Sequence, residues 1–282
     1  AFTFWLEKMH AGGEPTKGSS SFSEANQSRA GLRLAGQSFS EDGCPPMGLA
    51  RGGMLLKDVI AELKSMGNPK AAAGMARYGI KVDRALGVSI PKLQGLAKKI
   101  GKSHKLADEL WSSAIHEARI LACMIDDPQQ ITADQLERWV TEFDSWDLCD
   151  QCCNRLFSKT PVARQKALAW ASRPEEFVKR AGFVLMAVLA VHDKKAPDKQ
   201  FDPFFERIKA EAHDERNFVK KAVNWALRQI GKRNISLNKR AIRVAEEIQQ
   251  LKSRAARWVA SDALRELKSE KVQKRLSGRA MP

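Results

Sequence analysis

One short segment of the chain holds the residues whose types and spacing best suit chemistry. In Phe143-Asp144-Ser145-Trp146-Asp147-Leu148-Cys149-Asp150, Trp146 and Asp150 are four residues apart, so on a helix they lie on the same face, one turn from each other. A carboxylate can act as a general base or stabilise a developing positive charge, and the face of an indole ring attracts cations. Taken alone, a Trp is more often a core residue, and an Asp in a first helical turn more often interacts with the helix dipole.

Two further groups of residues strengthen the functional interpretation of this segment. Lys221, Trp225 and Arg228 share one face of an amphipathic stretch. Two cations that flank an aromatic ring suit a nucleic-acid groove, because the cations can contact phosphates while the ring contacts a sugar or base. Lys179 and Arg180 begin a very apolar helical stretch, a position where charges are normally solvated.

The charge of the chain favours a polyanionic partner. The 282 residues carry a formal net charge of +15. From Arg216 to Pro282 there are 18 basic and five acidic residues, a net charge of +13, whereas residues 1–53 hold five of each. A basic block of this kind suits DNA or RNA, because each phosphate contact releases condensed counterions. A merely soluble, basic helical surface is the alternative.

The elements that must position these residues are helices. Ala, Leu, Lys, Arg and Glu dominate the composition, which favours helix, and from Met54 onward apolar residues recur at spacings of three and four with short breaks. Gly231 is predicted as the C-cap of a helix that ends at Arg228. After Ser145 the helices form similar pairs, which predicts an all-α solenoid of stacked helical hairpins; a compact helical bundle is the alternative. The predicted breaks between helices lie at Asn68-Pro69, Ser89-Ile90-Pro91, Asp127-Pro128, Thr160-Pro161 and Arg173-Pro174.

Residues 1–53 differ from the rest in composition. They hold nine of the 18 glycines and seven serines, and their apolar residues show no period. We expect a disordered or non-native extension over 1–53, followed by one helical-repeat domain over 54–282 with basic C-terminal helices.

The cysteines and the longest apolar run indicate the cellular compartment in which we expect the protein. The five cysteines are odd in number and irregular in spacing, which argues against a disulfide framework, and none lies at zinc-ligand spacing. We interpret them as buried thiols in a reducing compartment, the bacterial cytosol or nucleoid. The apolar run Gly182–Val191 is about half as long as a membrane span requires, so we expect a buried helix and a cytoplasmic protein. The cysteines are Cys44, Cys123, Cys149, Cys152 and Cys153.

Five segments in order resemble the HEAT-repeat DNA alkylation-repair glycosylases (AlkD-like). No single segment is diagnostic, but the set runs from about Leu55 to Arg233 and includes the Trp-x-x-x-Asp motif. The matching segments are Met75-Ala76-Arg77-Tyr78, Leu86-Gly87-Val88-Ser89-Ile90-Pro91, Ser145-Trp146-Asp147-Leu148-Cys149-Asp150, Lys179-Arg180-Ala181, and Lys220-Lys221-Ala222-Val223-Asn224-Trp225-Ala226-Leu227-Arg228.

The resemblance implies an α-solenoid of HEAT-like repeats with a concave basic face, and a DNA glycosylase that excises N3- and N7-alkylated purines such as 3-methyladenine and 7-methylguanine from duplex DNA. It also implies that the base is not flipped into a pocket. By the same resemblance Asp150, Trp146 and Trp225 surround the damaged nucleotide, and Arg180 anchors a phosphate. The extension over 1–53 and a longer stretch near Lys194–Gln200 depart from the family pattern.

The chemistry implied for this site needs few groups. An alkylated purine is cationic and already a good leaving group, so Asp150 would only have to stabilise the charge that develops on the sugar and position water. Trp146 and Trp225 would offer cation–π contacts. Neither a metal nor a cofactor is required.

Three interpretations of the function of the whole chain follow from these observations. The first is the glycosylase, acting as a monomer on alkylated duplex DNA with no membrane and no obligatory protein partner. The second is a non-catalytic helical-repeat module that binds nucleic acid, and the third is a scaffold for protein partners. Lys179, Lys221, Arg228 and Lys92 are candidate DNA contacts; Lys92 follows Pro91 at a helix N-terminus that could face a phosphate. Trp111, Trp139, Trp170 and Trp258 are interpreted as packing residues.

Overall fold

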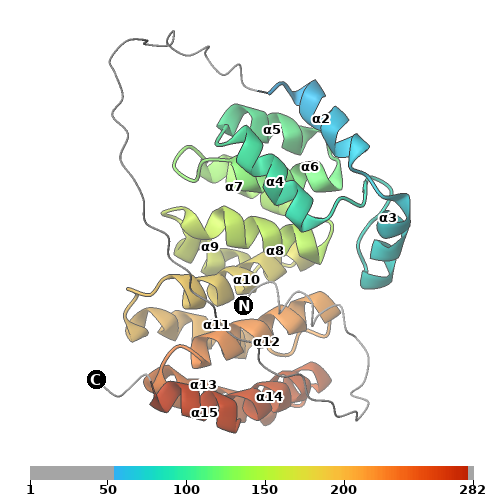
Figure 1. Ribbon diagram of the computed structural model, residues 1–282. Helices are drawn as coiled ribbons and strands as arrows, with labels where there is room; N and C mark the ends of the chain where they lie inside the picture. The colour runs from blue at the N-terminus through green and yellow to red at the C-terminus, as the bar shows by residue number, and fades with distance from the viewer. Residues whose placement is uncertain (1–53, 279–282) are drawn as a thin grey trace, which may run out of the picture. The chain divides into compact units, whose positions relative to one another are not determined.

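The computed structural model describes residues 54–278, and the expectations for residues 1–53 lie outside that range. Within it the chain is helical and contains no strand (Figure 1). The helices are α2 (Leu56–Ser65), α3 (Pro69–Met75), α4 (Ile90–Ile100), α5 (His104–Ser112), α6 (His116–Ile125), α7 (Ala133–Thr141), α8 (Trp146–Arg155), α9 (Ala163–Trp170), α10 (Glu176–His192), α11 (Asp202–Glu211), α12 (Asn217–Gly231), α13 (Ile235–Gln249), α14 (Arg254–Leu267) and α15 (Glu270–Ser277), with short 3-10 turns η1 (Ala76–Tyr78), η2 (Phe157–Lys159) and η3 (Asp198–Phe201). The prediction of an all-α chain is confirmed.

The helices stack in sequence order, as a solenoid requires. Helices α6, α8, α10, α12 and α14 form one row in which each helix packs on the next, and α5, α9, α11 and α13 pack beside α6, α10, α12 and α14 respectively. Figure 1 shows this succession from the green to the red helices. Contacts between immediate neighbours are the mark of a repeat array, so the solenoid is confirmed over the compact bundle.

Two predicted helix starts, at Asn68-Pro69 and at Ser89-Ile90-Pro91, are confirmed. Asn68 precedes α3 and its side chain accepts a hydrogen bond from the Ala71 amide at 3.0 Å, which satisfies one of the free N–H groups of the first turn. Ser89 precedes α4, and Pro91 occupies its first turn, where a missing N–H costs nothing.

Gly231 has a different role from the predicted one. Helix α12 continues past Arg228 and ends at Gly231 itself. A Cβ at this position would lie 2.7 Å from side-chain atoms of both Ala241 and Leu267. Glycine is therefore needed here for the close approach of α12 to α13 and α14, and the prediction of a C-cap was wrong because the constraint is packing rather than a left-handed turn.

A buried carboxylate fixes the loop before α4. Glu117 of α6 accepts hydrogen bonds from the amides of Leu86, Gly87 and Val88 at 2.8, 2.6 and 3.2 Å. Gly87 has φ +74°, and a Cβ there would lie 2.2 Å from the Asn68 carbonyl oxygen, so only glycine fits. One side chain thus ties the first described helices to the repeat array.

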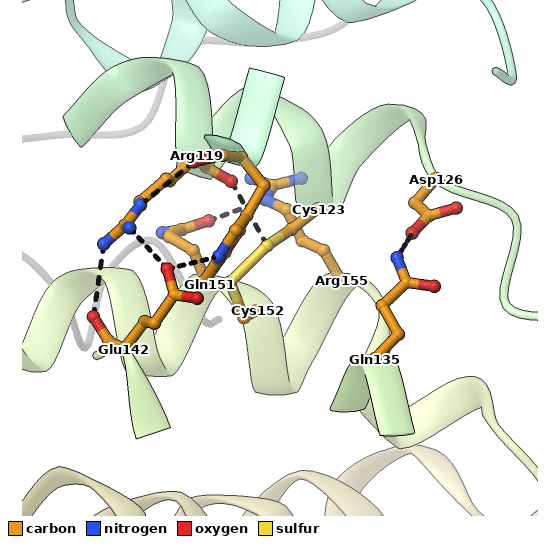
Figure 2. The surroundings of a disulfide bond; sticks show 9 residues. Arg119, Cys123, Asp126, Gln135, Glu142, Gln151, Cys152 and Arg155 are labelled. Atoms are coloured by element: carbon orange, nitrogen blue, oxygen red, sulfur yellow. Dashed lines mark hydrogen bonds and ion pairs between the residues drawn. A yellow bond between two sulfur atoms is a disulfide. The ribbon is translucent and has the colours of Figure 1, made fainter. Parts of the chain in front are cut away.

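A disulfide joins Cys123 on α6 to Cys152 on α8, with 5.3 Å between their Cα atoms (Figure 2). The expectation of thiols only was wrong for this pair, because the packing of α6 on α8 brings together two buried cysteines 29 residues apart. Cys149 and Cys153 are free and buried, as expected. Cys44 lies outside the described residues.

The apolar run predicted as a buried helix belongs to α10, in which every residue from Val178 to Ala190 is buried. None of the helices described for residues 54–278 has the length and apolar character needed to cross a bilayer.

Candidate active site

Helix α8 places the Trp-x-x-x-Asp motif. Ser145 precedes the helix in an extended conformation, although its side chain makes no capping hydrogen bond. Trp146 begins α8, and its indole Nε1 donates to the carbonyl oxygen of Tyr78 at 2.9 Å. The indole is thereby oriented by the turn η1, and Asp150 follows one helical turn later on the same face.

Asp150 and Arg180 form a buried bidentate ion pair. Nε of Arg180 donates to one carboxylate oxygen at 2.9 Å and Nη2 to the other at 2.8 Å, and both side chains are fully buried. Burial raises the pKa of Asp150 above its usual value, and the neighbouring guanidinium limits the rise. Planar two-point contact of this kind fixes the orientation of both groups.

Arg180 also connects three helices of the row. From α10 it reaches Asp150 on α8, and its Nη1 donates to the carbonyl oxygen of Phe218 on α12 at 2.7 Å. Its Cζ lies 6.0 Å from the centre of the Trp146 ring, within cation–π range. Nε, Nη1 and Nη2 of Arg180 all donate hydrogen bonds inside the protein. In this arrangement Arg180 therefore does not make the expected contact with a phosphate.

A second buried pair lies beside the first and was not identified from the sequence. Nε2 of His116 on α6 lies 2.8 Å from a carboxylate oxygen of Asp147. Burial alone would lower the pKa of His116, but Asp147 raises it above 6.5, and His116 in turn holds the pKa of Asp147 below its usual value. The two residues are 31 positions apart, and no sequence spacing links a residue on α6 to one on α8.

The α12 face carries the remaining aromatic residue of the predicted site. With the Gln229 amide oriented to accept hydrogen bonds, its oxygen lies 2.9 Å from Nε1 of Trp225. Lys221, one turn before Trp225, makes none of the ion pairs described for residues 54–278. Burial and the positive charges of Arg180 and Lys220 lower the pKa of Lys221, so an anion next to Lys221 would relieve this repulsion.

The other predicted cations have protein partners or lie elsewhere. Arg228 contacts Asp262 at 2.8 Å and also Glu266 on α14. Lys179 lies 2.5 Å from Glu211 and 3.5 Å from Asp214, whereas Lys92 on α4 is exposed and donates only to the Met66 carbonyl oxygen at 3.4 Å among its described contacts. The structure therefore gathers Trp146, Asp150 and Arg180, with the α12 face beside them, and leaves Lys92 outside this group.

Within residues 54–278 no three His, Cys, Asp or Glu side chains gather in a way that could hold a metal ion. The arrangement holds a buried carboxylate that Arg180 orients, with the buried Trp146 indole beside Arg180 and the Lys221 ammonium near the same guanidinium. Carboxylate and indole suit a cationic group, and the ammonium suits a phosphate.

Comparison with known proteins identifies the family to which these residues belong. A family model described as "DNA alkylation repair enzyme" matches residues 59–272, a range that includes every residue of the candidate site. A curated relative from Listeria innocua, the uncharacterized protein Lin0241, is 23% identical over 191 residues, which cover 66% of this chain and 83% of that protein.

A solved structure shares the fold. It is described as "A new family of proteins related to the HEAT-like repeat DNA glycosylases with affinity for branched DNA structures". Its TM-score is 0.64 at 21% sequence identity, and the match covers 76% of this chain and 95% of that one. The fold is therefore the HEAT-like helical-repeat solenoid.

Proposed function

Because this chain belongs to the DNA alkylation repair enzyme family, we propose that it is a DNA glycosylase that releases N3- and N7-alkylated purines from duplex DNA, without moving the base into a pocket. The observation that carries the proposal is the convergence of Trp146, Asp150 and Arg180 from α8 and α10. A fixed carboxylate beside an indole face is the arrangement that a departing cationic base and a developing sugar cation require.

The ion pair sets the order of events in this mechanism. Arg180 holds the Asp150 carboxylate in one orientation, so the carboxylate is positioned before DNA binds. As the N-glycosidic bond lengthens, positive charge develops on the deoxyribose, and a carboxylate oxygen turns from Arg180 toward C1′ or toward a water molecule. The hydrogen bond from Arg180 to the Phe218 carbonyl keeps the guanidinium in place during this change.

A second function, DNA binding without catalysis, is favoured by one specific observation. Both oxygens of Asp150 are engaged by Arg180, and this leaves neither for the sugar unless a hydrogen bond breaks. DNA as the ligand is supported by the C-terminal net charge of +13 and by the uncompensated Lys221. In this alternative the pair is a structural element, and the protein recognises DNA only.

Base release from methylated duplex DNA separates the two functions. Wild-type protein should release 7-methylguanine and 3-methyladenine, and Asp150→Asn and Trp225→Ala should each lower the single-turnover rate by 10²-fold or more, the order of magnitude expected for one electrostatic group. Asp134→Asn is the matched control, since Asp134 is an exposed carboxylate on α7 and should leave the rate unchanged.

The outcomes are distinct. DNA binding without base release by the wild type would establish the non-catalytic function. Release by Asp150→Asn at the wild-type rate would refute the role of the carboxylate while leaving the activity in place. In either case Lys221→Gln should reduce the slope of log affinity against log salt concentration by about 1, as loss of one phosphate contact predicts.

A further inference from the structure

Trp258 on α14 is the exposed tryptophan of the described residues. Its relative exposure is 41%, against 1% or less for Trp111, Trp139 and Trp170. The interpretation of all four as packing residues is confirmed for the three buried rings and was wrong for Trp258. An indole exposed to this degree leaves part of a large apolar surface in water, and an aromatic ring among basic side chains suits a ligand that combines flat bases with phosphates.

Basic side chains surround this ring. Nζ of Lys220 on α12 lies 5.8 Å from the centre of the Trp258 ring, within cation–π range. On α14, Arg254 and Arg265 lie four residues before and seven residues after Trp258, so all three share one face, and each is exposed. This group, Lys220, Arg254, Trp258 and Arg265, is called the α14 platform below.

Two carboxylates lie at the edges of the α14 platform. Glu215 accepts hydrogen bonds from the Ser253 hydroxyl and the Ala255 amide at 3.2 and 3.0 Å, and Asp262 pairs with Arg265 and with Arg228. Both are therefore engaged. The platform keeps a net positive charge beside an indole that is partly exposed.

The α14 platform continues the candidate active site. Lys220 is adjacent in sequence to Lys221, whose pKa is lowered by the nearby charge of Arg180, and α12 packs directly on α14. Neighbouring packed helices lie about 10 Å apart, so the three steps from α8 through α10 and α12 to α14 span about 30 Å, which corresponds to roughly nine nucleotides of a strand at 3.4 Å per phosphate. One DNA strand that passes the Asp150 site can therefore reach Trp258.

We propose that the α14 platform binds an unpaired nucleobase, stacked on the indole of Trp258 with Lys220 and Arg254 contacting the adjacent phosphates. In continuous duplex the faces of a base are covered by its neighbours, so a flat aromatic side chain finds an open base only in a single-stranded arm, gap or flap. The protein therefore prefers forked DNA to continuous duplex. This inference rests on DNA being the ligand, as in the proposed function, and is independent of catalysis.

The test compares affinities for two DNA molecules of equal phosphate number, a fork with a single-stranded arm and a continuous duplex, measured by fluorescence anisotropy at one salt concentration. Trp258→Ala should weaken fork binding about tenfold, the loss expected for one stacked base, and leave duplex binding unchanged. Trp258→Phe should retain most of the fork affinity. Leu251→Ala is the matched control, because Leu251 is an apolar residue of similar exposure, 37%, and lies outside the platform.

A second measurement isolates the stacking contact. Abasic positions placed in the single-stranded arm should weaken wild-type binding about tenfold and should not weaken binding by Trp258→Ala further, because both changes remove the same contact. Circular dichroism melting should show that the exposed substitution leaves the fold intact.

Three results would overturn the inference. The first is that Trp258→Ala weakens the affinity for fork and duplex equally. The second is that it weakens neither affinity, which would assign the ring to a protein partner, and the third is that abasic positions leave the affinity of the wild type unchanged. The glycosylase proposal is tested separately. Trp258→Ala and wild type should release bases from methylated duplex at the same rate. A wild type that prefers forks but releases no base would refute only the glycosylase activity.

Discussion

Replacing Arg180 by Met removes the group that holds the candidate active site together. The substitution keeps the length and apolar stem of the side chain but deletes the donors to both oxygens of Asp150 and to the Phe218 carbonyl oxygen. A buried carboxylate is left without a counter-charge, and the pKa of Asp150, already raised by burial, rises further because the lowering effect of Arg180 is lost.

The size of the effect follows from the burial of both groups. Removing one partner of a buried ion pair costs about 3–5 kcal/mol of unfolding free energy. For a domain of this size 1 kcal/mol corresponds to roughly 2–4 °C in Tm, so Arg180→Met should lower Tm by about 10 °C. The matched control is Arg138→Met, which breaks the exposed pair with Asp108, whose side chains are 52% and 44% exposed; this should cost less than about 1 kcal/mol.

The assay is urea and thermal unfolding followed by far-UV circular dichroism for wild type, Arg180→Met, Asp150→Leu and the double variant. The double variant replaces both charges by apolar groups, so it should recover much of the loss seen in either single variant. The reasoning is refuted if Arg180→Met costs no more than Arg138→Met, or if the two single losses simply add in the double variant.

Three other predictions concern the scaffold around this pair. Glu117→Ala leaves three loop amides without their acceptor and should cost about 2–4 kcal/mol in urea unfolding, whereas an unchanged midpoint would mean that the loop is held by other contacts. The His116–Asp147 pair should contribute most to the free energy of unfolding between pH 3.8 and 6.5, the pKa values of the two groups in the unfolded chain. Because the pKa of His116 is raised in the folded protein, this contribution is lost as the pH rises above 6.5 and through the folded value. The stability difference between wild type and His116→Gln should therefore shrink between pH 6 and pH 9, and a constant difference would contradict the pairing. The disulfide closes a loop of 29 residues, so reduction by dithiothreitol should cost wild type about 3–4 kcal/mol and should cost Cys123→Ser nothing; equal responses would show that Cys123 and Cys152 are not bonded.

Local features of the fold were predictable because their causes are local. Asn68 and Pro91 mark helix starts by satisfying or lacking particular backbone donors, and those requirements depend on a few adjacent residues. The position of Trp258 also had a local signal: on α14 it lies opposite the buried stripe of small apolar residues, so the helical period places its ring on the solvent side.

The ion pair between Asp150 and Arg180 in the candidate site could not be predicted from the sequence. Both Asp150 and Arg180 were identified, but the family resemblance assigned Arg180 to a phosphate. The 30-residue separation between Arg180 and Asp150 carries no information about which group the guanidinium contacts. The partner is decided by the packing of α8 on α10, which is a property of the whole hairpin stack. The disulfide and Gly231 depend in the same way on contacts between helices.

Covalent, ionic and hydrogen-bonded links cross each step of the helix row from α6 to α14, and this limits how far the array can bend. A stack of repeats changes its curvature through small rotations between neighbouring helices. Cys123–Cys152 crosses the step from α6 to α8, and Arg180 crosses the two steps from α8 to α12. The step from α12 to α14 is crossed by a buried hydrogen bond from the Asn224 amide to the Val259 carbonyl oxygen at 3.0 Å, and by the ion pairs of Arg228 and Lys232 with Glu266. Each step of the row from α6 to α14 is therefore tied by at least one specific link, so the row should bind DNA with little change in curvature and keep Asp150 at a fixed position relative to α14.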